Sequence, residues 1–322
     1  IDPTGATIQP ISGIVSISGT VEVTQNTSPW ASNITQFGNA NISTGVGASG
    51  VGIPRVTVSD DSNILATIVE HKVKEVAERK NQISIATLKK MPLFSKPALS
   101  LKENLLKPSA TGIIAEFKRK SPSKGMINEK ASVREVTAAY HAYGAAGISV
   151  LTDTHFFGGS LADLTIAIEN PLPVLRKEFI IDEFQIFESK AYGASVILLI
   201  AACLTATQTQ ILAATAKELG MEVLLELHDE TELGHICDEV DMVGINNRSL
   251  KSFDVDIQHS LTLKNQLPQG KLSIAESGIY SVETYQLLKE KGFNGFLMGE
   301  YFMKKENPAL EFEQFTKAIK TK

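Results

Sequence analysis

The stretch from residue 194 to residue 227, ASVILLIAACLTATQTQILAATAKELGMEVLLEL, decides the fold. It contains two short apolar runs, Ala194–Ile200 and Glu222–Leu227, on either side of a helical pattern. Thr205 offers an N-cap oxygen to that helix, and Gly220 ends it. Continuous apolar runs of this length, joined by a helix, are typical of parallel strands that are buried on both faces. The stretch therefore predicts a strand–helix–strand unit.

The same alternation of short apolar runs and helical patterns continues along most of the chain. Ser281 can cap a helix that ends at Gly292, and Asn307-Pro308 can open the last helix. Eight strand–helix units fit one closed (β/α)8 TIM barrel. An open, doubly wound sheet is the competitor, but it normally needs a GxGxxG or GxxxxGK[ST] loop, and neither occurs. The eight predicted strands are Gly112–Phe117, Gly147–Thr152, Pro173–Arg176, Ala194–Ile200, Glu222–Leu227, Asp241–Ile245, Lys271–Ala275 and Gly295–Met298.

Residues 1–62 differ in composition from the rest of the chain. They contain no lysine or histidine and are rich in Gly, Ser, Thr, Asn and Val. The loose alternation of Ile14–Val23 favours short strands. We expect residues 1–62 to be a β-prone or disordered appendage or fusion segment, similar in composition to modules of some phage structural proteins. Residues 63–322 should form the barrel, preceded by an extra amphipathic helix with its apolar face at Leu65, Ile68, Val69, the stem of Lys72, Val73 and Val76.

The overall composition narrows the functional class. With 43% hydrophobic and 21% charged residues the chain is globular, and a net charge of −5 argues against a general nucleic-acid binder. The longest apolar run, Val196–Cys203, is too short to cross a bilayer. Because no secretory signal pattern opens the sequence, we expect a cytoplasmic protein. Cys203 and Cys237 form no CxxC pair, so both are expected to be free thiols.

Polar residues collect at the ends of six predicted strands. In a parallel barrel the active site lies at the C-terminal ends of the strands. If Ile114 points into the barrel, Glu116 and Lys118 on the same face stand at its mouth. A single charge at a strand end is usually only solvated, but the shared pattern predicts one functional site. The other five strand ends are Arg176-Lys177-Glu178, Glu226, Asn246-Asn247-Arg248, Glu276-Ser277-Gly278 and Gly299-Glu300.

Two loops and a basic segment predict a phosphate site. Barrels of this class often bind phosphate between the loops after strands seven and eight, which here contain Ser277-Gly278 and Gly299-Glu300. Glycine lets backbone N–H groups approach an anion closely. The loop after the first strand, KRKSPSKG at residues 118–125, can fold over a phosphate and exclude water. An ordinary solvated basic loop is the alternative.

Seven motifs, in order, resemble those of indole-3-glycerol-phosphate synthases. This resemblance extends from about residue 63 to the C-terminus and implies ring closure, with loss of carbon dioxide and water, of 1-(2-carboxyphenylamino)-1-deoxyribulose 5-phosphate in tryptophan biosynthesis. The family uses no metal and no organic cofactor, in agreement with the lack of ligand spacing among the six histidines. The motifs are IAEFKRKSPSKG (114–125), LTDTHFFGGS (151–160), PVLRKEFIID (173–182), LLELHDETEL (224–233), GINNRSL (244–250), AESGI (275–279) and FLMGEYFM (296–303).

The resemblance also implies roles for individual residues. Lys177 matches the general acid that protonates the ribulose carbonyl, and Lys118 would bind the substrate carboxylate or act as a second acid. Glu226 matches the acid/base group of the dehydration. A lysine at a crowded, cationic mouth is expected to have a lowered pKa. The remaining matches are Glu116, Asn246 and Glu276 for positioning the substrate and the lysines, Arg248 for organising carboxylates, Ser121, Ser277, Gly278, Gly299 and the backbone of Glu300 for the phosphate, and Phe157 and Phe179 for the apolar wall.

Two other interpretations stay open at this stage. One is another phosphate-binding barrel such as phosphoribosylanthranilate isomerase, which releases no carbon dioxide. The other is a structural or adhesive fusion protein that carries an inactive barrel. The favoured interpretation predicts a small-molecule sugar-phosphate substrate, no nucleic-acid or membrane partner, and a monomer with at most weak association with other tryptophan-pathway enzymes.

Overall fold

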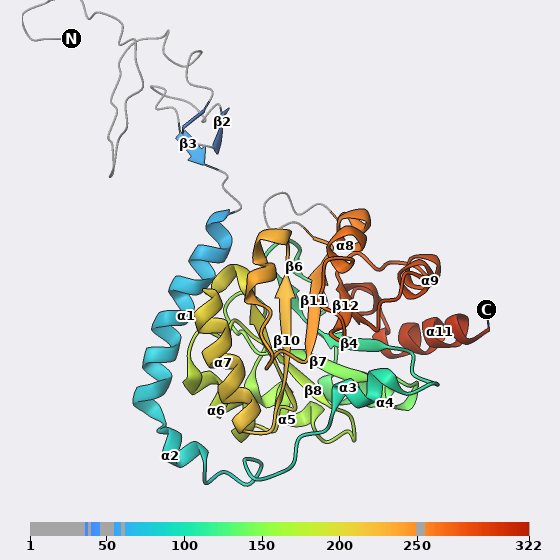
Figure 1. Cartoon of the computed structure of the whole chain (residues 1–322), viewed down its shortest axis with the longest axis horizontal. Coiled ribbons are helices and arrows are strands. Elements are labelled where there is room, and N and C mark those ends of the chain that lie inside the picture. The colour runs from blue at the N-terminus through green and yellow to red at the C-terminus, as the bar shows by residue number, and fades with distance from the viewer. Residues whose placement is uncertain (1–35, 38–39, 46–54, 59–61, 249–254, 322) are drawn as a thin grey trace, which may run out of the picture. The chain divides into compact units, whose positions relative to one another are not determined.

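The computed structural model describes residues 36–37, 40–45, 55–58, 62–248 and 255–321, which divide between two compact units, Ile1–Asp60 and Asp61–Lys322 (Figure 1). In the first unit, strands β1 (Gln36–Phe37), β2 (Ala40–Gly45) and β3 (Arg55–Val58) form an antiparallel sheet in the order β1-β2-β3. The strands expected at Ile14–Val23 lie outside the described residues.

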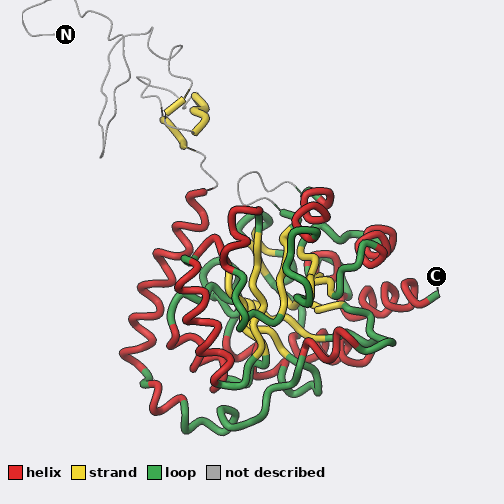
Figure 2. The backbone as a smooth tube through the Cα atoms, in the orientation of Figure 1, coloured by secondary structure: helices red, strands yellow, loops and turns green. Residues whose placement is uncertain are grey.

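The second unit is a closed barrel of eight parallel strands, enclosed by helices (Figure 2). Each strand pairs with the next along the chain, and the last pairs with the first. The predicted (β/α)8 fold is therefore confirmed, with strand bounds within two residues of those expected. The strands are β4 (Ile113–Phe117), β7 (Gly147–Leu151), β8 (Val174–Lys177), β9 (Val196–Ile200), β10 (Glu222–Leu227), β11 (Met242–Asn246), β12 (Leu272–Glu276) and β13 (Gly295–Met298).

The helices begin at the predicted capping residues. Thr205 caps α7 through a reciprocal capping box with Gln208, Ser281 caps α9, and Asn307 caps α11 with Pro308 in its first turn. A small hairpin, β5 (Lys120–Ser121) with β6 (Gly125–Met126), follows the first barrel strand. The helices are α1 (Ser62–Gln82), α2 (Ile85–Leu88), α3 (Leu101–Leu106), α4 (Val133–Ala142), α5 (Leu161–Ala167), α6 (Glu183–Ala191), α7 (Ala206–Glu218), α8 (Ile257–Lys264), α9 (Val282–Glu290), α10 (Glu300–Met303) and α11 (Pro308–Lys320), with 3-10 turns η2 (Ala201–Cys203) and η3 (Glu230–His235).

Alternation along the strands divides the core into two layers. Ile114, Leu198 and Leu224 belong to the cluster inside the barrel. Their neighbours Ile113 and Val223 belong to the cluster between the strands and the helices. Both clusters are almost fully buried, which explains why the strands are continuous apolar runs. Because Ile114 points inward, the next residues on its face rise toward the C-terminal mouth, as expected.

The opposite end of the barrel is closed by helix α3. Its residues Leu101 and Leu105 join the interior cluster, with exposed fractions of 1% and 7%. The carboxylate of Glu222, at the start of β10, accepts hydrogen bonds from the backbone N–H groups of Leu101 (2.8 Å) and Lys102 (3.1 Å). A carboxylate at a helix N-terminus satisfies backbone donors that the helix leaves unpaired. This contact fixes α3 as the floor of the barrel.

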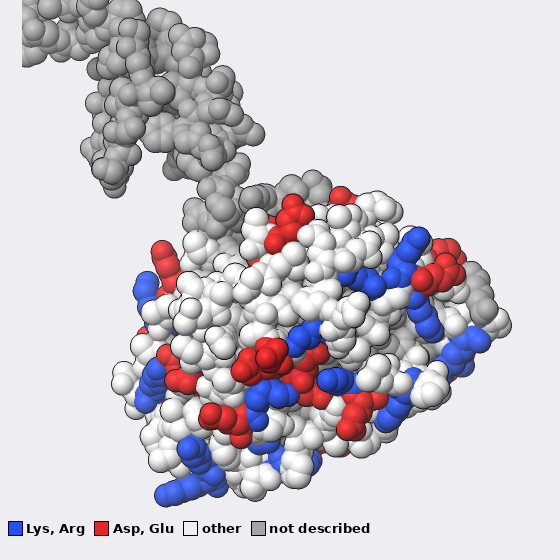
Figure 3. All heavy atoms as spheres, viewed as in Figure 1, with Lys and Arg blue, Asp and Glu red and all other residues white. Residues whose placement is uncertain are grey.

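The extra N-terminal helix α1 runs along the outside of the barrel and contacts α6 (Figure 1). Ile68, Lys72 and Val76 are buried on its inner face, whereas Val73 is 54% exposed. The predicted helix is therefore confirmed, but its buried face includes the entire lysine side chain rather than its stem alone. None of the helices in the described part of the chain could span a membrane. On the face drawn in Figure 3, acidic and basic side chains lie beside one another in mixed groups, and much of the surface around them is uncharged.

Candidate active site

A cavity of about 220 Å³ opens at the C-terminal ends of the barrel strands. The fourteen residues expected at the site all line it, although they come from seven different strand ends or loops. The cavity thus brings together residues that are separated by up to 184 positions in the chain. These residues are Glu116, Lys118, Ser121, Phe157, Lys177, Phe179, Glu226, Asn246, Arg248, Glu276, Ser277, Gly278, Gly299 and Glu300.

Lys177, the last residue of β8, lies at the centre of the charged cluster. Its Nζ donates hydrogen bonds to Glu226 Oε2 at 2.8 Å and to Glu276 Oε2 at 2.7 Å. Burial alone would disfavour the ammonium, but the carboxylates of Glu226, Glu276 and Glu116 outweigh it and raise the pKa of Lys177 above its ordinary value. The expected lowering of this pKa is therefore wrong. The sequence placed these three carboxylates at the same mouth but did not show that they would all surround this lysine.

The two carboxylates that contact Lys177 have different protonation behaviour. Burial acts against ionisation of Glu226, but Lys177 and His228 overcome it and hold the pKa of Glu226 well below its usual range. Burial and the charge of Glu226 raise the pKa of Glu276 to about 7, despite Lys177. Glu276 Oε1 has no hydrogen-bond partner among the described residues. Near neutral pH the site therefore holds one firmly ionised carboxylate beside one that titrates.

His228, which follows β10, was not among the residues expected at the site. Its side chain is 7% exposed, with Nε2 3.2 Å from Glu226 Oε1 and Nδ1 3.7 Å from Glu232 Oε2. Burial disfavours the imidazolium, but these two carboxylates prevail and raise the pKa of His228 to about 9. The residue also lines the cavity. Sequence reasoning missed it, although its place two residues after Glu226, and hence on the same face of an extended chain, was a usable signal.

The remaining polar residues of the mouth orient these groups. Asn246 Nδ2 donates to Glu226 Oε1 at 2.8 Å, and the Asn246 side-chain oxygen accepts the backbone N–H of Arg248 at 3.0 Å. Lys118 Nζ lies 3.0 Å from Glu116 Oε1. Gly299 allows this arrangement, because a Cβ at that position would lie 2.7 Å from the Cβ of Glu116. The ends of β4 and β13 are therefore packed closely against each other.

One end of the cavity is shaped by unusual backbone. Ser277 has a φ of 64° and is the only non-glycine residue with a positive φ in the described part of the chain. Gly278 follows it with a φ of 72°. Asn247 Nδ2 donates to the carbonyl oxygen of Ser277 at 2.7 Å and supports this turn. A serine in the left-handed region is strained by about 1 kcal/mol or more, and such strain clusters at binding sites. Arg248 Nη2 lies 3.3 Å from Glu300 Oε2 beside this turn.

The other end of the cavity is apolar. The rings of Phe157 and Phe179 pack against each other with centroids 5.9 Å apart. Ile64, Leu65 and Ile68 of helix α1 add further apolar lining to the cavity. Sequence reasoning expected the two aromatic residues but not the contribution of α1. Its amphipathic pattern predicted a buried face without indicating which part of the barrel that face would cover.

Sequence comparison identifies the family. The family model for indole-3-glycerol phosphate synthase matches residues 65–315. The chain belongs to the indole-3-glycerol phosphate synthase family. An indole-3-glycerol phosphate synthase of Bacteroides thetaiotaomicron is 46% identical over 260 residues, which cover 80% of this chain and 99% of the relative. An indole-3-glycerol phosphate synthase of Acinetobacter baylyi is 39% identical over 256 residues, which cover 79% of this chain and 95% of the relative. The chain is therefore an enzyme of the carboxy-lyase class.

Solved structures show the same architecture at low identity. A tryptophan synthase α-subunit variant from Pyrococcus furiosus superimposes with a TM-score of 0.52 and 13% identity, covering 66% of this chain and 99% of that one. The tryptophan synthase α-subunit of Legionella pneumophila gives a TM-score of 0.52 and 12% identity, covering 69% of this chain and 98% of that one. At this identity the likeness concerns the barrel fold alone. The family match begins at residue 65, so the expected likeness of residues 1–62 to phage proteins stays a prediction.

Proposed function

We propose that the cavity binds 1-(2-carboxyphenylamino)-1-deoxyribulose 5-phosphate and converts it into indole-3-glycerol phosphate, carbon dioxide and water. The observation that carries the proposal is the convergence of Lys177, Glu226 and Glu276 from three strands, with Nζ–Oε distances of 2.7 and 2.8 Å, between an apolar wall and a strained, glycine-containing turn. A substrate with an aromatic ring at one end and a phosphate at the other matches this polarity.

The phosphate is assigned to the end of the cavity formed by the loops after β12 and β13. Ser277, Gly278 and Gly299 offer close backbone approach there, and Glu300 contributes its backbone N–H rather than its carboxylate. Ser121, in the hairpin after β4, lines the same cavity and adds a hydroxyl donor. Arg248 is held beside this end by Glu300 and by the Tyr280 hydroxyl at 3.1 Å. It compensates the negative charge that the substrate brings.

Ring closure begins at the ribulose carbonyl. The aromatic carbon that bears the carboxylate attacks the carbonyl carbon, and the carbonyl oxygen takes a proton from the Lys177 ammonium to become a hydroxyl. Because its pKa is raised, Lys177 is fully protonated at neutral pH, and its charge also stabilises negative charge developing on that oxygen. The substrate carboxylate faces Lys118. Its loss as carbon dioxide leaves the bonding electrons in the ring and restores aromaticity.

Dehydration then completes the indole. The hydroxyl takes a proton from Glu276 and leaves as water, while a base removes a proton from the neighbouring carbon, and the electrons of that C–H bond form the ring double bond. Glu226 suits the base because Lys177 and His228 keep it ionised. Glu276, with a pKa of about 7, can hold or return a proton in the same step. Glu116 and Asn246 keep Lys118 and Glu226 in place.

The test is an assay that follows indole fluorescence from the carboxyphenylamino sugar phosphate. Stoichiometric release of carbon dioxide distinguishes this activity from that of an isomerase barrel, and its absence would refute the proposal. A truncated chain lacking residues 1–60 tests the remaining alternative. Full turnover in that variant shows that the enzyme is the barrel, whereas activity that depends on residues 1–60 would contradict the expectation of a dispensable appendage.

The proposal includes the expected surroundings of the enzyme. It acts as a cytoplasmic monomer on a small phosphorylated substrate, with at most weak association with other tryptophan-pathway enzymes. The mixed charges on the face shown in Figure 3 support a surface without a single-sign patch there. Light scattering of the purified full-length chain measures the oligomeric state, and a mass twice that of one chain would contradict the monomer.

A further inference from the structure

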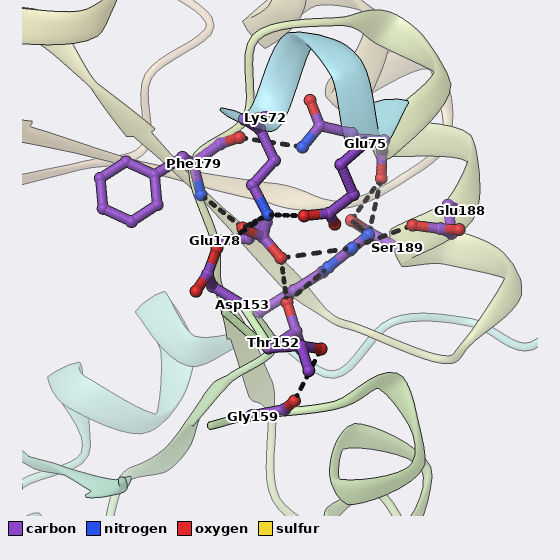
Figure 4. Close-up of polar contacts among 12 residues, drawn as sticks. Lys72, Glu75, Thr152, Asp153, Gly159, Glu178, Phe179, Glu188 and Ser189 are labelled. Atoms are coloured by element: carbon purple, nitrogen blue, oxygen red, sulfur yellow. Dashed lines mark hydrogen bonds and ion pairs between the residues drawn. The ribbon is translucent and has the colours of Figure 1, made fainter. Parts of the chain in front are cut away.

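Helix α1 carries one charged side chain, Lys72, that is fully buried against the loops after β7 and β8. The Lys72 side chain has an exposed fraction of 0%, and its Nζ lies 3.0 Å from Asp153 Oδ2, 3.0 Å from Glu178 Oε1 and 2.9 Å from Glu75 Oε2 (Figure 4). Asp153 and Glu178 are themselves buried, with exposed fractions of 0% and 1%. Burial disfavours the ammonium, but Glu178 and Asp153 outweigh it, so the pKa of Lys72 lies above its ordinary value.

Asp153 connects Lys72 to the loop that carries Phe157. Its Oδ1 accepts the backbone N–H groups of Phe156 at 2.7 Å and Phe157 at 3.2 Å, which fixes the turn after β7. Its Oδ2 makes no hydrogen bond to any described residue and faces the Lys72 ammonium. Without Lys72 this oxygen is a buried charge with no cation next to it. A buried, unpaired charge costs free energy, and the loop that carries Phe157 can lower this cost by moving so that the carboxylate reaches water.

Glu178 connects Lys72 to the residues that follow β8. Its Oε1 accepts the backbone N–H of Phe179 at 2.9 Å, and its Oε2 accepts the Thr152 hydroxyl at 2.7 Å. Glu178 directly follows Lys177, and Thr152 directly follows β7. The same ammonium therefore contacts two carboxylates that orient the two loops from which the aromatic wall is built.

The backbone of Lys177 is held by the β-ladder, whereas the loops that carry Phe157 and Phe179 are not. Lys177 belongs to β8, and its carbonyl oxygen accepts the backbone N–H of Thr152 at 3.2 Å across the ladder. Phe157 and Phe179 lie beyond the strands, where no ladder holds them. Their rings nevertheless meet at 5.9 Å between centroids and line the cavity.

We propose that Lys72 is a positioning residue for the aromatic wall. By pairing with both Asp153 and Glu178, it holds the rings of Phe157 and Phe179 in the positions where they contact the aromatic ring of the substrate. This inference rests on the proposed function. It also explains why α1 takes part in a site whose charged groups all come from the barrel, since the helix supplies apolar lining through Leu65 and Ile68 and the cation that orders the aromatic wall.

The test compares Lys72→Met with Asp153→Asn in the full chain. Met keeps the length of the side chain and removes the charge, and Asn keeps the Oδ1 acceptor for the turn. An aromatic wall binds the ring equally in the ground and transition states, so Lys72→Met should raise KM roughly tenfold while kcat changes less than about threefold. Asp153→Asn should raise KM by about threefold, and the double variant should fall short of the product of the two effects because both disturb one contact.

Lys80→Met is the matched control. Lys80 lies two turns further along α1 and forms a partly exposed pair with Asp182 at 2.7 Å, away from the cavity. It should leave KM and kcat unchanged. Absence of turnover in the wild-type chain refutes the proposed function, whatever the variants do. Wild-type turnover with an unchanged KM in Lys72→Met, even if its thermal midpoint falls, overturns the positioning role. If Lys72→Met does not fold, Asp153→Asn decides, and an unchanged KM there overturns the proposal equally.

Discussion

His228 offers the sharpest test of the charge arrangement in the active site. Its pKa rises from 6.5 to about 9 on folding, and a shift of that size corresponds to on the order of 3 kcal/mol of stability. Because the folded pKa is the higher one, the contribution is fully present below pH 6.5 and is lost as the pH rises through about 9. The charged groups that face the ring are Glu226, near the end of β10, and Glu232 in η3.

His228→Gln should therefore destabilise the chain in a pH-dependent way. At pH 6 its thermal midpoint, followed by far-ultraviolet circular dichroism, should lie roughly 5–10 °C below that of the wild type. At pH 9.5 most of that difference should disappear. His141→Gln, on the exposed side of α4, is the control and should show no such difference. An equal loss of midpoint at both pH values would refute the reasoning, because it would mean that His228 is neutral in the folded chain.

Three further substitutions test the assigned roles. Lys177→Ala should lower kcat by ~10²-fold or more, the usual scale for a general acid, and near-normal turnover would remove Lys177 from that role. Ser277→Asp places a negative charge beside the assigned phosphate and should raise KM about tenfold or more, whereas an unchanged KM would argue against this location. Gly299→Ala puts a Cβ 2.7 Å from that of Glu116 and should lower kcat/KM by about tenfold. Its control is Gly234→Ala, where no atom lies within 4 Å of an added Cβ and where normal kinetics are expected.

The barrel could be predicted because its signals are local. Each strand is a short apolar run that is buried on both faces, and helices such as α7 and α9 carry their own capping residues. The location of the site followed from one geometric rule, since the C-terminal ends of parallel strands meet at one mouth. That rule placed Lys118, Lys177 and Glu226 together although no local sequence feature connects them.

The electrostatics of the site could not be predicted in the same way. Whether the pKa of Lys177 rises or falls depends on Glu226 and Glu276, which lie 49 and 99 residues away in the chain. A lysine on an amphipathic helix is normally exposed at its tip, so the complete burial of Lys72 depends on carboxylates that only the folded barrel brings near it. The composition of residues 1–62 indicated a β-prone segment, but strands β1 to β3 lie later in that segment than the one stretch whose alternation was visible.

The closed floor of the barrel has a kinetic consequence. Leu101 and Leu105 of α3, held by Glu222, fill the bottom of the barrel, and the cavity lies at the other end, where the strands finish. We therefore expect product to leave through the same mouth by which substrate enters, and in the proposed reaction both carry a phosphate for the turn at Ser277 and Gly278. Accumulating product should therefore inhibit the enzyme competitively with substrate. Turnover in the cell will then depend on how rapidly the following enzyme consumes the product.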